Sequence, residues 1–301
     1  MDELRFDGRA VVITGAGRGI GRSHALLLAA RGAQVVVADF GAELDGTATS
    51  RAPAEDVVKE IEANGGEAVA CYASVAEEEG AAAIVECALE RFGRLDAVIN
   101  NAGISDKHLF GDLSSEQFRR MMAVHFFGTV HVTKAAWPHF VSAQYGRVVN
   151  TTSEAVLGAQ DNLTSYGSAK GAIWAFTRNL AAEGVAFGIR VNAVAPRALT
   201  RMSAAGQTAD GGTGTSDQIS PVLARMKPEL VAPAAAYLAH ESCPLTGEVL
   251  IAGGGDVMRL TPVVTMGISK ETMTMEDIAE NIDAILSIDD AKVAPIGTYA
   301  R

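Results

Sequence analysis

Short runs of β-branched and apolar residues alternate along the chain with longer segments in which apolar residues recur every three or four positions. The short runs have the length and composition of buried strands, and the longer segments those of amphipathic helices. This alternation is typical of βαβ units in a parallel sheet. Seven runs fit the description, so we expect an α/β fold with strands at residues 9–15, 33–40, 67–72, 95–103, 146–153, 189–196 and 248–254.

One of the expected helices is long, and two further segments depart from this rhythm. A long helix is expected from about Ser114, where "SSEQ" offers a cap with a glutamine three residues on, to about Ser142, with a bend at Pro138. The stretches 41–53 and 206–217 are rich in glycine, threonine and serine, which predicts an insertion after the second strand and a mobile loop after the sixth.

Beyond the seventh strand the chain continues for a further segment, which we predict to be an extension (256–301) with one helix over 274–288. Its apolar side chains form one stripe opposite an acidic face, and the stripe consists of Ile278, Ile282, Ile285 and Leu286. Such a stripe needs an apolar partner. Three arrangements remain open: packing on its own subunit, covering the rim of a substrate pocket, or crossing to a neighbouring subunit.

Composition narrows the class of protein. The 301 residues, 48% of them hydrophobic, suffice for one large domain or two small ones, and the net charge of −11 disfavours nucleic acid and anionic membrane surfaces as partners. No window approaches the ~20 apolar residues of a membrane span. Cys71, Cys87 and Cys243 are far apart and form no C-x-x-C pair, so neither a disulfide framework nor a metal site is expected, and a reducing cytoplasm fits.

The sequence "TGAGRGIG" (14–21) follows the first predicted strand and opens a helix. In this context Gly15 allows the tight turn, Gly19 lets the backbone approach a pyrophosphate and Gly21 permits close helix packing, which predicts a dinucleotide site. Asp39 ends the second strand, where a carboxylate binds the adenosine ribose and repels a 2′-phosphate. NAD is therefore favoured over NADP, although Arg18 in the turn offers a contact for that phosphate.

The sequence "TSYGSAKGAIWAF" (164–176) places a phenol and an ammonium on one helix face, because Tyr166 and Lys170 are four residues apart. A neighbouring ammonium and an oxidised nicotinamide both favour the phenolate and lower the pKa of the tyrosine, which suits proton transfer. Ser153 ends the fifth strand, where ligand sites of such sheets lie, and its hydroxyl can donate to a carbonyl or alkoxide oxygen.

Over residues 5–255 the chain resembles the short-chain dehydrogenase/reductase family. The matching residues are "TGAGRGIG", "NNAG" (100–103), Ser153, the "Y-x-x-x-K" pair Tyr166 and Lys170, and Pro196. The resemblance implies one Rossmann-type, doubly wound domain (1–255) with helices on both faces. It also implies that Tyr166 is the general acid/base, that Ser153 orients the substrate oxygen, and that Lys170 holds the nicotinamide ribose. The further cofactor contacts that it implies are Ile20, Ser74, Val75, Asn101, Ala102, Gly103, Ala198 and Thr200.

Longer segments, including "VHFFGTVHVTKAAWPHF" and "MKPELVAPAAAYLAHESC", resemble the (3R)-hydroxyacyl-CoA dehydrogenase domain of multifunctional enzymes of peroxisomal type 2. That subgroup shares His125 and Ser74, which replace an asparagine and an aspartate usual in the wider family, whereas Arg197 stands where the family usually has glycine. If the main-chain carbonyl at His125 holds a relay water, its side chain is exchangeable. The resemblance further implies a homodimer or homotetramer built on the long helices.

We therefore expect an NAD-dependent oxidoreductase that interconverts a secondary alcohol and a ketone. The substrate suggested first is a 3-hydroxyacyl-CoA, with a hydroxysteroid or another cyclic alcohol as the alternative. Four cations are candidates for contacts to CoA phosphates, namely Arg197, Arg201, Arg225 and Lys227. A different class, a cofactor-binding sensor without turnover, is disfavoured because it would not need Ser153, Tyr166 and Lys170 together.

Overall fold

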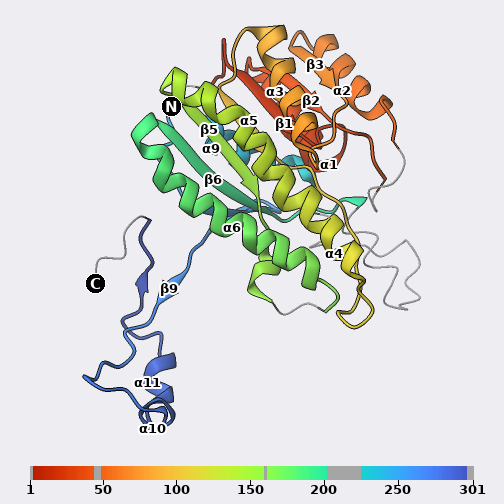
Figure 1. The fold of residues 1–301 in the computed structure, drawn as a ribbon. Helices are drawn as coiled ribbons and strands as arrows, with labels where there is room; N and C mark the ends of the chain where they lie inside the picture. Colours follow the sequence, from red (N-terminus) through yellow and green to blue (C-terminus); the bar gives the residue numbers. More distant parts are fainter. Residues whose placement is uncertain (1–2, 44–48, 159–160, 202–224, 297–301) are drawn as a thin grey trace.

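The computed structural model of the protein describes residues 3–43, 49–158, 161–201 and 225–296. Within them, eight strands form one sheet in the order β3-β2-β1-β4-β5-β6-β7-β8 (Figure 1). The predicted loop at 206–217 lies outside the described residues. The strands of this sheet are β1 (Ala10–Thr14), β2 (Gln34–Ala38), β3 (Glu67–Cys71), β4 (Ala97–Asn100), β5 (Gly146–Thr151), β6 (Ile189–Pro196), β7 (Val249–Gly253) and β8 (Asp256–Leu260).

The first seven strands are parallel, as predicted, and the order of the strands reverses between β1 and β4. The eighth strand was not predicted. It pairs antiparallel with β7 through a two-residue turn, Gly254-Gly255, in which both residues have positive φ. Gly-Gly is a favoured sequence for such a hairpin turn. The side chains of β8 are mostly exposed, so the strand lacks the apolar run that marked the other seven.

Helices cover both faces of the sheet. Successive residues of a strand point to opposite faces, so Val11 and Ile13 pack with α1, α2 and α9, whereas Val12 packs with α3, α5 and α6. The two apolar cores thus follow from the period of two in the strand sequences. The helices are α1 (Gly19–Ala30), α2 (Ala52–Ala63), α3 (Glu78–Phe92), α4 (Ser115–Met122), α5 (Gly128–Ala143), α6 (Thr164–Gly184) and α9 (Ala232–Ala239), and the 3-10 turns are η2 (Glu154–Leu157), η3 (Val185–Phe187) and η4 (Pro228–Leu230).

The long helix predicted from Ser114 is divided into α4, a π-helical turn η1 (Ala123–Phe127) and α5. Its start is confirmed: the Ser114 hydroxyl accepts from the Gln117 amide (3.2 Å), and the Gln117 side chain accepts from the Ser114 amide (3.0 Å). The hydrogen-bond pattern changes at η1, whereas Pro138 lies inside α5. The irregular turn contains His125, whose side chain is buried.

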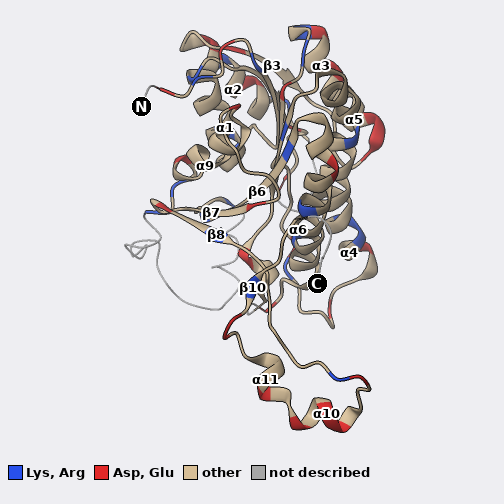
Figure 2. Ribbon diagram, turned by 90° about the vertical axis from the view of Figure 1, so that its left-hand side faces the viewer, with Lys and Arg blue, Asp and Glu red and all other residues tan. Residues whose placement is uncertain are grey.

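The extension runs away from the body of the molecule and returns to it (Figures 1 and 2). It contains β9 (Val263–Val264), α10 (Met275–Glu280), α11 (Ile282–Leu286) and β10 (Lys292–Val293), with β10 antiparallel to β9. The single helix predicted there is wrong, because Asn281 leaves the helical conformation (φ −115°, ψ 20°) and separates two short helices. No helix in the described part of the chain has the length and apolar character needed to cross a membrane.

Candidate active site

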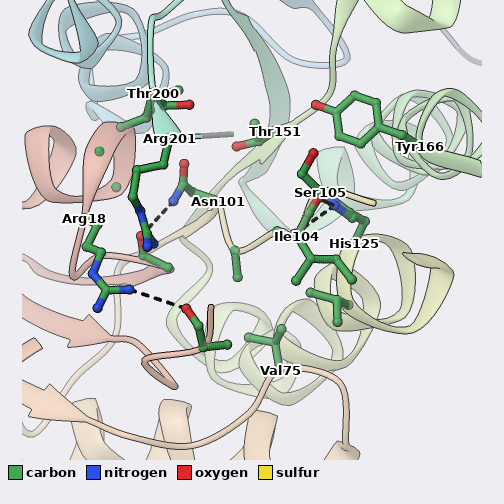
Figure 3. Close-up of a pocket in the computed structure, with 18 of the residues that line it drawn as sticks. Arg18, Val75, Asn101, Ile104, Ser105, His125, Thr151, Tyr166, Thr200 and Arg201 are labelled. Carbon is green, nitrogen blue, oxygen red and sulfur yellow. Dashed lines mark hydrogen bonds between the residues drawn. The ribbon is translucent and has the colours of Figure 1, made fainter. Parts of the chain in front are cut away.

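A cavity of about 1200 Å³ opens where the carboxyl ends of the parallel strands meet (Figure 3). Ligands of open α/β sheets bind at this edge, next to the point where the strand order reverses. The structure brings every predicted site residue to the lining of this one cavity. They are Gly15, Arg18, Gly19, Ile20, Gly21, Asp39, Ser74, Val75, Asn101, Ala102, Gly103, Ser153, Tyr166, Lys170, Pro196, Ala198 and Thr200.

The glycine turn leaves room for a ligand because side chains are excluded from it. A Cβ on Gly21 would lie 2.1 Å from the carbonyl oxygen of Gly15, so α1 packs against the turn only with glycine at this position. Arg18 precedes the helix without a side-chain cap, and the first amides of α1 remain donors at the cavity edge. Asn101 holds the turn, since its Nδ2 donates to the carbonyls of Thr14 (2.9 Å) and Gly15 (3.1 Å). This cradle fits a pyrophosphate at a helix N-terminus.

Asp39 follows β2 and is fixed by two backbone amides. Its Oδ2 accepts from the Gly17 amide and its Oδ1 from the Gly41 amide, both at 2.7 Å. Arg18 lies beside it, and its Nη1 donates to the carbonyl of Ala42 at 3.4 Å (Figure 3). The carboxylate thus occupies a defined position at the end of the cavity, where the sequence predicts the adenosine ribose.

The three candidate catalytic residues meet between β5 and α6. Ser153 Oγ accepts from the Ala155 amide at 3.1 Å and lines the cavity together with Tyr166. Lys170, one helical turn beyond Tyr166, is 3% exposed; its Nζ donates to the carbonyl of Thr151 at 2.7 Å and lies 5.6 Å from the centre of the Tyr166 ring. The predicted shared face of α6 is therefore present, and no sequence pattern had indicated Thr151 as a partner of Lys170.

Burial dominates the ionisation of this pair. It lowers the pKa of Lys170 from 10.5 to about 7. Burial also raises the pKa of Tyr166, and the Ser153 side chain acts in the opposite direction. The expected lowering of the Tyr166 pKa by Lys170 is therefore outweighed by desolvation within the protein. The tyrosine is held as a phenol, the form that donates a proton to a developing alkoxide.

His125 contributes its ring to the site, which the sequence did not indicate. The ring is buried, its Nε2 lies 2.9 Å from the carbonyl oxygen of Ile104, and it meets the Tyr166 ring edge-on with 5.3 Å between centroids (Figure 3). Burial, and then the charge of Lys170, hold the pKa of His125 well below its ordinary value. Its carbonyl oxygen, proposed for a relay water, accepts from the Thr129 hydroxyl at 2.8 Å.

The cations considered for CoA phosphates are largely engaged within the chain. Arg197 forms two hydrogen bonds with Glu154, and Arg201 lies 3.4 Å from Glu43. Arg225 donates to the carbonyl of Gly254 at 3.2 Å. Glu154 is a cavity residue that the sequence analysis did not select.

With this site and fold, the chain belongs to the short chain dehydrogenase family, whose sequence profile matches residues 9–210. The short-chain type dehydrogenase/reductase Rv0148 of Mycobacterium tuberculosis is 42% identical over 95% of this chain and 96% of its own length. Peroxisomal multifunctional enzyme type 2 of Mus musculus is 37% identical over 96% of this chain, which spans 38% of that protein.

A solved structure supports the same assignment. The 7 alpha-hydroxysteroid dehydrogenase complexed with NADH and 7-oxo glycochenodeoxycholic acid has a TM-score of 0.72 and 31% identity to this chain. The match covers 85% of this chain and 98% of that protein. The chain is thus a short-chain oxidoreductase, and its cavity lies in a fold that binds a dinucleotide in that relative.

Proposed function

We propose that the protein is an NAD-dependent dehydrogenase that interconverts a 3-hydroxyacyl thioester, best represented by a 3-hydroxyacyl-CoA, and its 3-oxo form. The observation that carries the proposal is the arrangement of Ser153, Tyr166 and the buried Lys170 at one wall of the cavity. A bound nicotinamide dinucleotide would supply or accept the hydride. The glycine turn, the first amides of α1 and Asp39 would hold its pyrophosphate and adenosine ribose.

The chain's own residues would act on the substrate oxygen. In the reducing direction the Tyr166 hydroxyl donates its proton to that oxygen, and the Ser153 hydroxyl donates a hydrogen bond to it. The Lys170 ammonium, fixed on Thr151, would bind the nicotinamide ribose and favour the phenolate that remains. In the oxidising direction the same groups work in reverse.

The preference for NAD rests on Asp39. Its carboxylate is fixed by two amides, so a 2′-phosphate would approach a fixed negative charge. Arg18 is the competing influence, since a guanidinium beside the ribose would attract that phosphate. We give Asp39 more weight because it lies at the end of β2 and Arg18 is directed to a backbone carbonyl.

A hydroxysteroid is the second candidate, favoured by the similarity to a hydroxysteroid dehydrogenase. The thioester substrate has the stronger support, because the similarity to multifunctional enzyme type 2 extends over 96% of this chain and the similarity to the steroid enzyme over 85%. The experiment is a spectrophotometric assay at 340 nm of 3-hydroxyacyl-CoAs and hydroxysteroids, each with NAD and NADP. Turnover of hydroxysteroids alone would reverse the ranking, and binding of NAD without any turnover would favour the sensor.

We further place the enzyme in the cytoplasm, as a homodimer or homotetramer in lipid metabolism. Its three cysteines are free thiols, which suits a reducing compartment. Phe127 is 47% exposed at the start of α5 and stacks on His131, so this helix offers an apolar surface to a second copy. Light scattering coupled to gel filtration tests the assembly, and cell fractionation tests the compartment.

A further inference from the structure

An ion pair closes the cavity wall beside the candidate catalytic serine. Arg197 Nε lies 2.6 Å from Glu154 Oε2, and Arg197 Nη2 lies 2.5 Å from Glu154 Oε1. Glu154 directly follows Ser153, whereas Arg197 follows Pro196 at the end of β6. Both side chains are 33% exposed and both line the cavity. The pair therefore joins the ends of two neighbouring strands at the place where the substrate must lie.

This pair presents hydrogen-bond donors without a net charge. Glu154 is ionised, because the hydrogen bond from Arg197 lowers the pKa of its carboxyl. The fork engages Nε and Nη2, and within the described residues Arg197 Nη1 has no hydrogen-bond partner. An anion at Nη1 would meet the negative charge of Glu154 and also that of Asp256, which acts electrostatically on the guanidinium. A neutral acceptor such as a carbonyl oxygen avoids that repulsion.

We propose that Arg197, held by Glu154, binds the thioester carbonyl oxygen of the substrate and so selects 3-oxoacyl and 3-hydroxyacyl thioesters. This proposal rests on the proposed function, and in it the Arg197 guanidinium is the group that distinguishes thioesters from other ketones. Ser153 and Tyr166 engage the reacting oxygen, and the second oxygen of such a substrate sits two carbons away. Ser153 and Arg197 line the same cavity, so a substrate whose first oxygen is at Ser153 can offer its second oxygen to the guanidinium.

The test uses two ketones that differ by one oxygen: the N-acetylcysteamine thioester of 3-oxobutanoate and its thioether analogue, in which a methylene replaces the thioester carbonyl. Reduction by NADH is measured for the wild type and for Arg197→Met. We expect kcat/KM for the thioester to fall on the order of 10- to 100-fold and that for the thioether to change less than about threefold. For each substrate the rate of Arg197→Met is divided by the rate of the wild type, so the intrinsic difference in reactivity between the two ketones cancels.

Two further variants sharpen the test. Glu154→Gln keeps an acceptor for Arg197 and removes the compensating charge, so free 3-oxobutanoate should gain relative to the thioester. Arg259→Met is the control, because it removes another bidentate ion pair. Arg259 donates two hydrogen bonds of 2.7 Å to Glu248, and neither residue lines the cavity. This control should leave both ketones unaffected. Fluorescence titration with NADH checks that each variant still binds the cofactor.

The outcomes separate the inference from the proposed function. Equal losses on thioester and thioether would show that the pair only braces the Ser153 turn, and would overturn the inference while leaving the proposed function intact. An unchanged thioester rate in Arg197→Met would overturn it as well. If the wild type reduces the thioether or a steroid ketone but not the thioester, the proposed function fails, and the inference fails with it.

Discussion

The His125 ring lies directly against the backbone of Gly103, and a Cβ on Gly103 would stand 2.4 Å from Cε1 of the ring. The ring cannot retreat, because it is 1% exposed, contacts Ile104 through Nε2 and meets Tyr166 edge-on. The glycine of "NNAG" therefore has a packing reason for its identity. The His125 side chain thus contacts both Gly103, in the loop after β4, and Tyr166, the candidate acid/base.

Gly103→Ala should accordingly push the His125 ring toward Tyr166. We expect kcat/KM to fall about tenfold or more, because a small displacement of an acid/base group is costly. His125→Ala alone should cost less, and the double variant should recover part of the loss, since the second change vacates the space that the methyl group needs. Steady-state kinetics of the four proteins give this coupling. Strictly additive losses would contradict it.

The second prediction concerns the acid/base. Tyr166→Phe removes the hydroxyl and keeps the ring that packs on His125, so turnover should fall by a factor on the order of 10² to 10⁴ with nearly unchanged NAD binding. Lys170→Ala should impair cofactor binding and turnover together, because one ammonium would serve both. Stopped-flow kinetics and NADH titration separate the two effects. Retained turnover in Tyr166→Phe would remove it from the mechanism.

Much of this site was predictable because it depends on short, local patterns. The "Y-x-x-x-K" spacing places Tyr166 and Lys170 on one helix face, and the strand ends fix where Ser153 and Asp39 lie. The contact between Arg197 and Glu154 was not predictable, since it joins residues 43 positions apart on separate strand ends. Likewise, desolvation of Tyr166 raises its pKa and reverses the simple expectation that Lys170 lowers it, and desolvation is a property of the folded chain.

The fold, too, was predictable where local sequence patterns determine it and was not predictable elsewhere. Seven strands have apolar runs that a buried sheet requires, and all seven were recognised. Strand β8 was missed because its side chains are exposed, although Gly254-Gly255 marked its turn. The tail helix was predicted as continuous because the apolar spacing runs through Asn281, and the spacing alone does not report where the backbone leaves the helix.

The third prediction concerns cofactor choice. Because Asp39 is fixed by the Gly17 and Gly41 amides, NAD should be preferred over NADP by about tenfold or more in kcat/KM. Asp39→Asn keeps most of the shape and removes the charge, so the preference should shrink, while Arg18→Ala should enlarge it. Initial rates with both cofactors measure each ratio. Equal use of NAD and NADP by the wild type would mean that Arg18 outweighs the carboxylate.

The fourth prediction is a pH dependence of stability that arises from His24 on α1. Its ring is buried, neither nitrogen has a hydrogen-bond partner in the described structure, and burial lowers its pKa from 6.5 to about 4. Between these values the unfolded chain binds the proton and the folded chain does not. The stability that the neutral His24 ring allows is therefore fully present above pH 6.5, and the free energy of unfolding decreases as the pH falls toward 4.

His24→Leu should flatten this dependence and leave the protein more stable at pH 5 than the wild type, by about 1–3 kcal/mol. Urea unfolding at pH 7.5 and pH 5, followed by circular dichroism, gives the change in the free energy of unfolding with pH for each of the two proteins. His139→Leu is the matched control, because that histidine is exposed on α5. Parallel acid destabilisation of the wild type and His24→Leu would exclude the buried ring as a cause.

The last prediction concerns the extension, whose apolar stripe is not buried on its own chain. Ile278, Ile282 and Leu286 are all exposed, Leu286 to 66%, while the ribbon in Figure 2 marks acidic residues along α10 and α11. Both ends of the excursion are nevertheless tied to the body: β8 pairs with β7, and Arg178 Nη2 donates to the Ala294 carbonyl at 2.7 Å. The arrangement disfavours packing on the same subunit and favours contact with a second copy.

Deleting every residue after Arg259 should leave a folded, NAD-binding protein with a raised KM for its bulky substrate. A cleaner variant replaces 266–290 by a short Gly-Ser linker, because it keeps β8, the Arg178 contact and Ile296, which packs against the core of α3, α5 and α6. If the stripe lies on a neighbouring subunit, this variant should show weaker assembly by light scattering as well as the higher KM, while its NADH affinity stays the same. Leu286→Glu should reproduce both effects in the full chain, since a charge at an exposed position harms only an interface. Unchanged KM and assembly in all three variants would show that the extension has no part in the site.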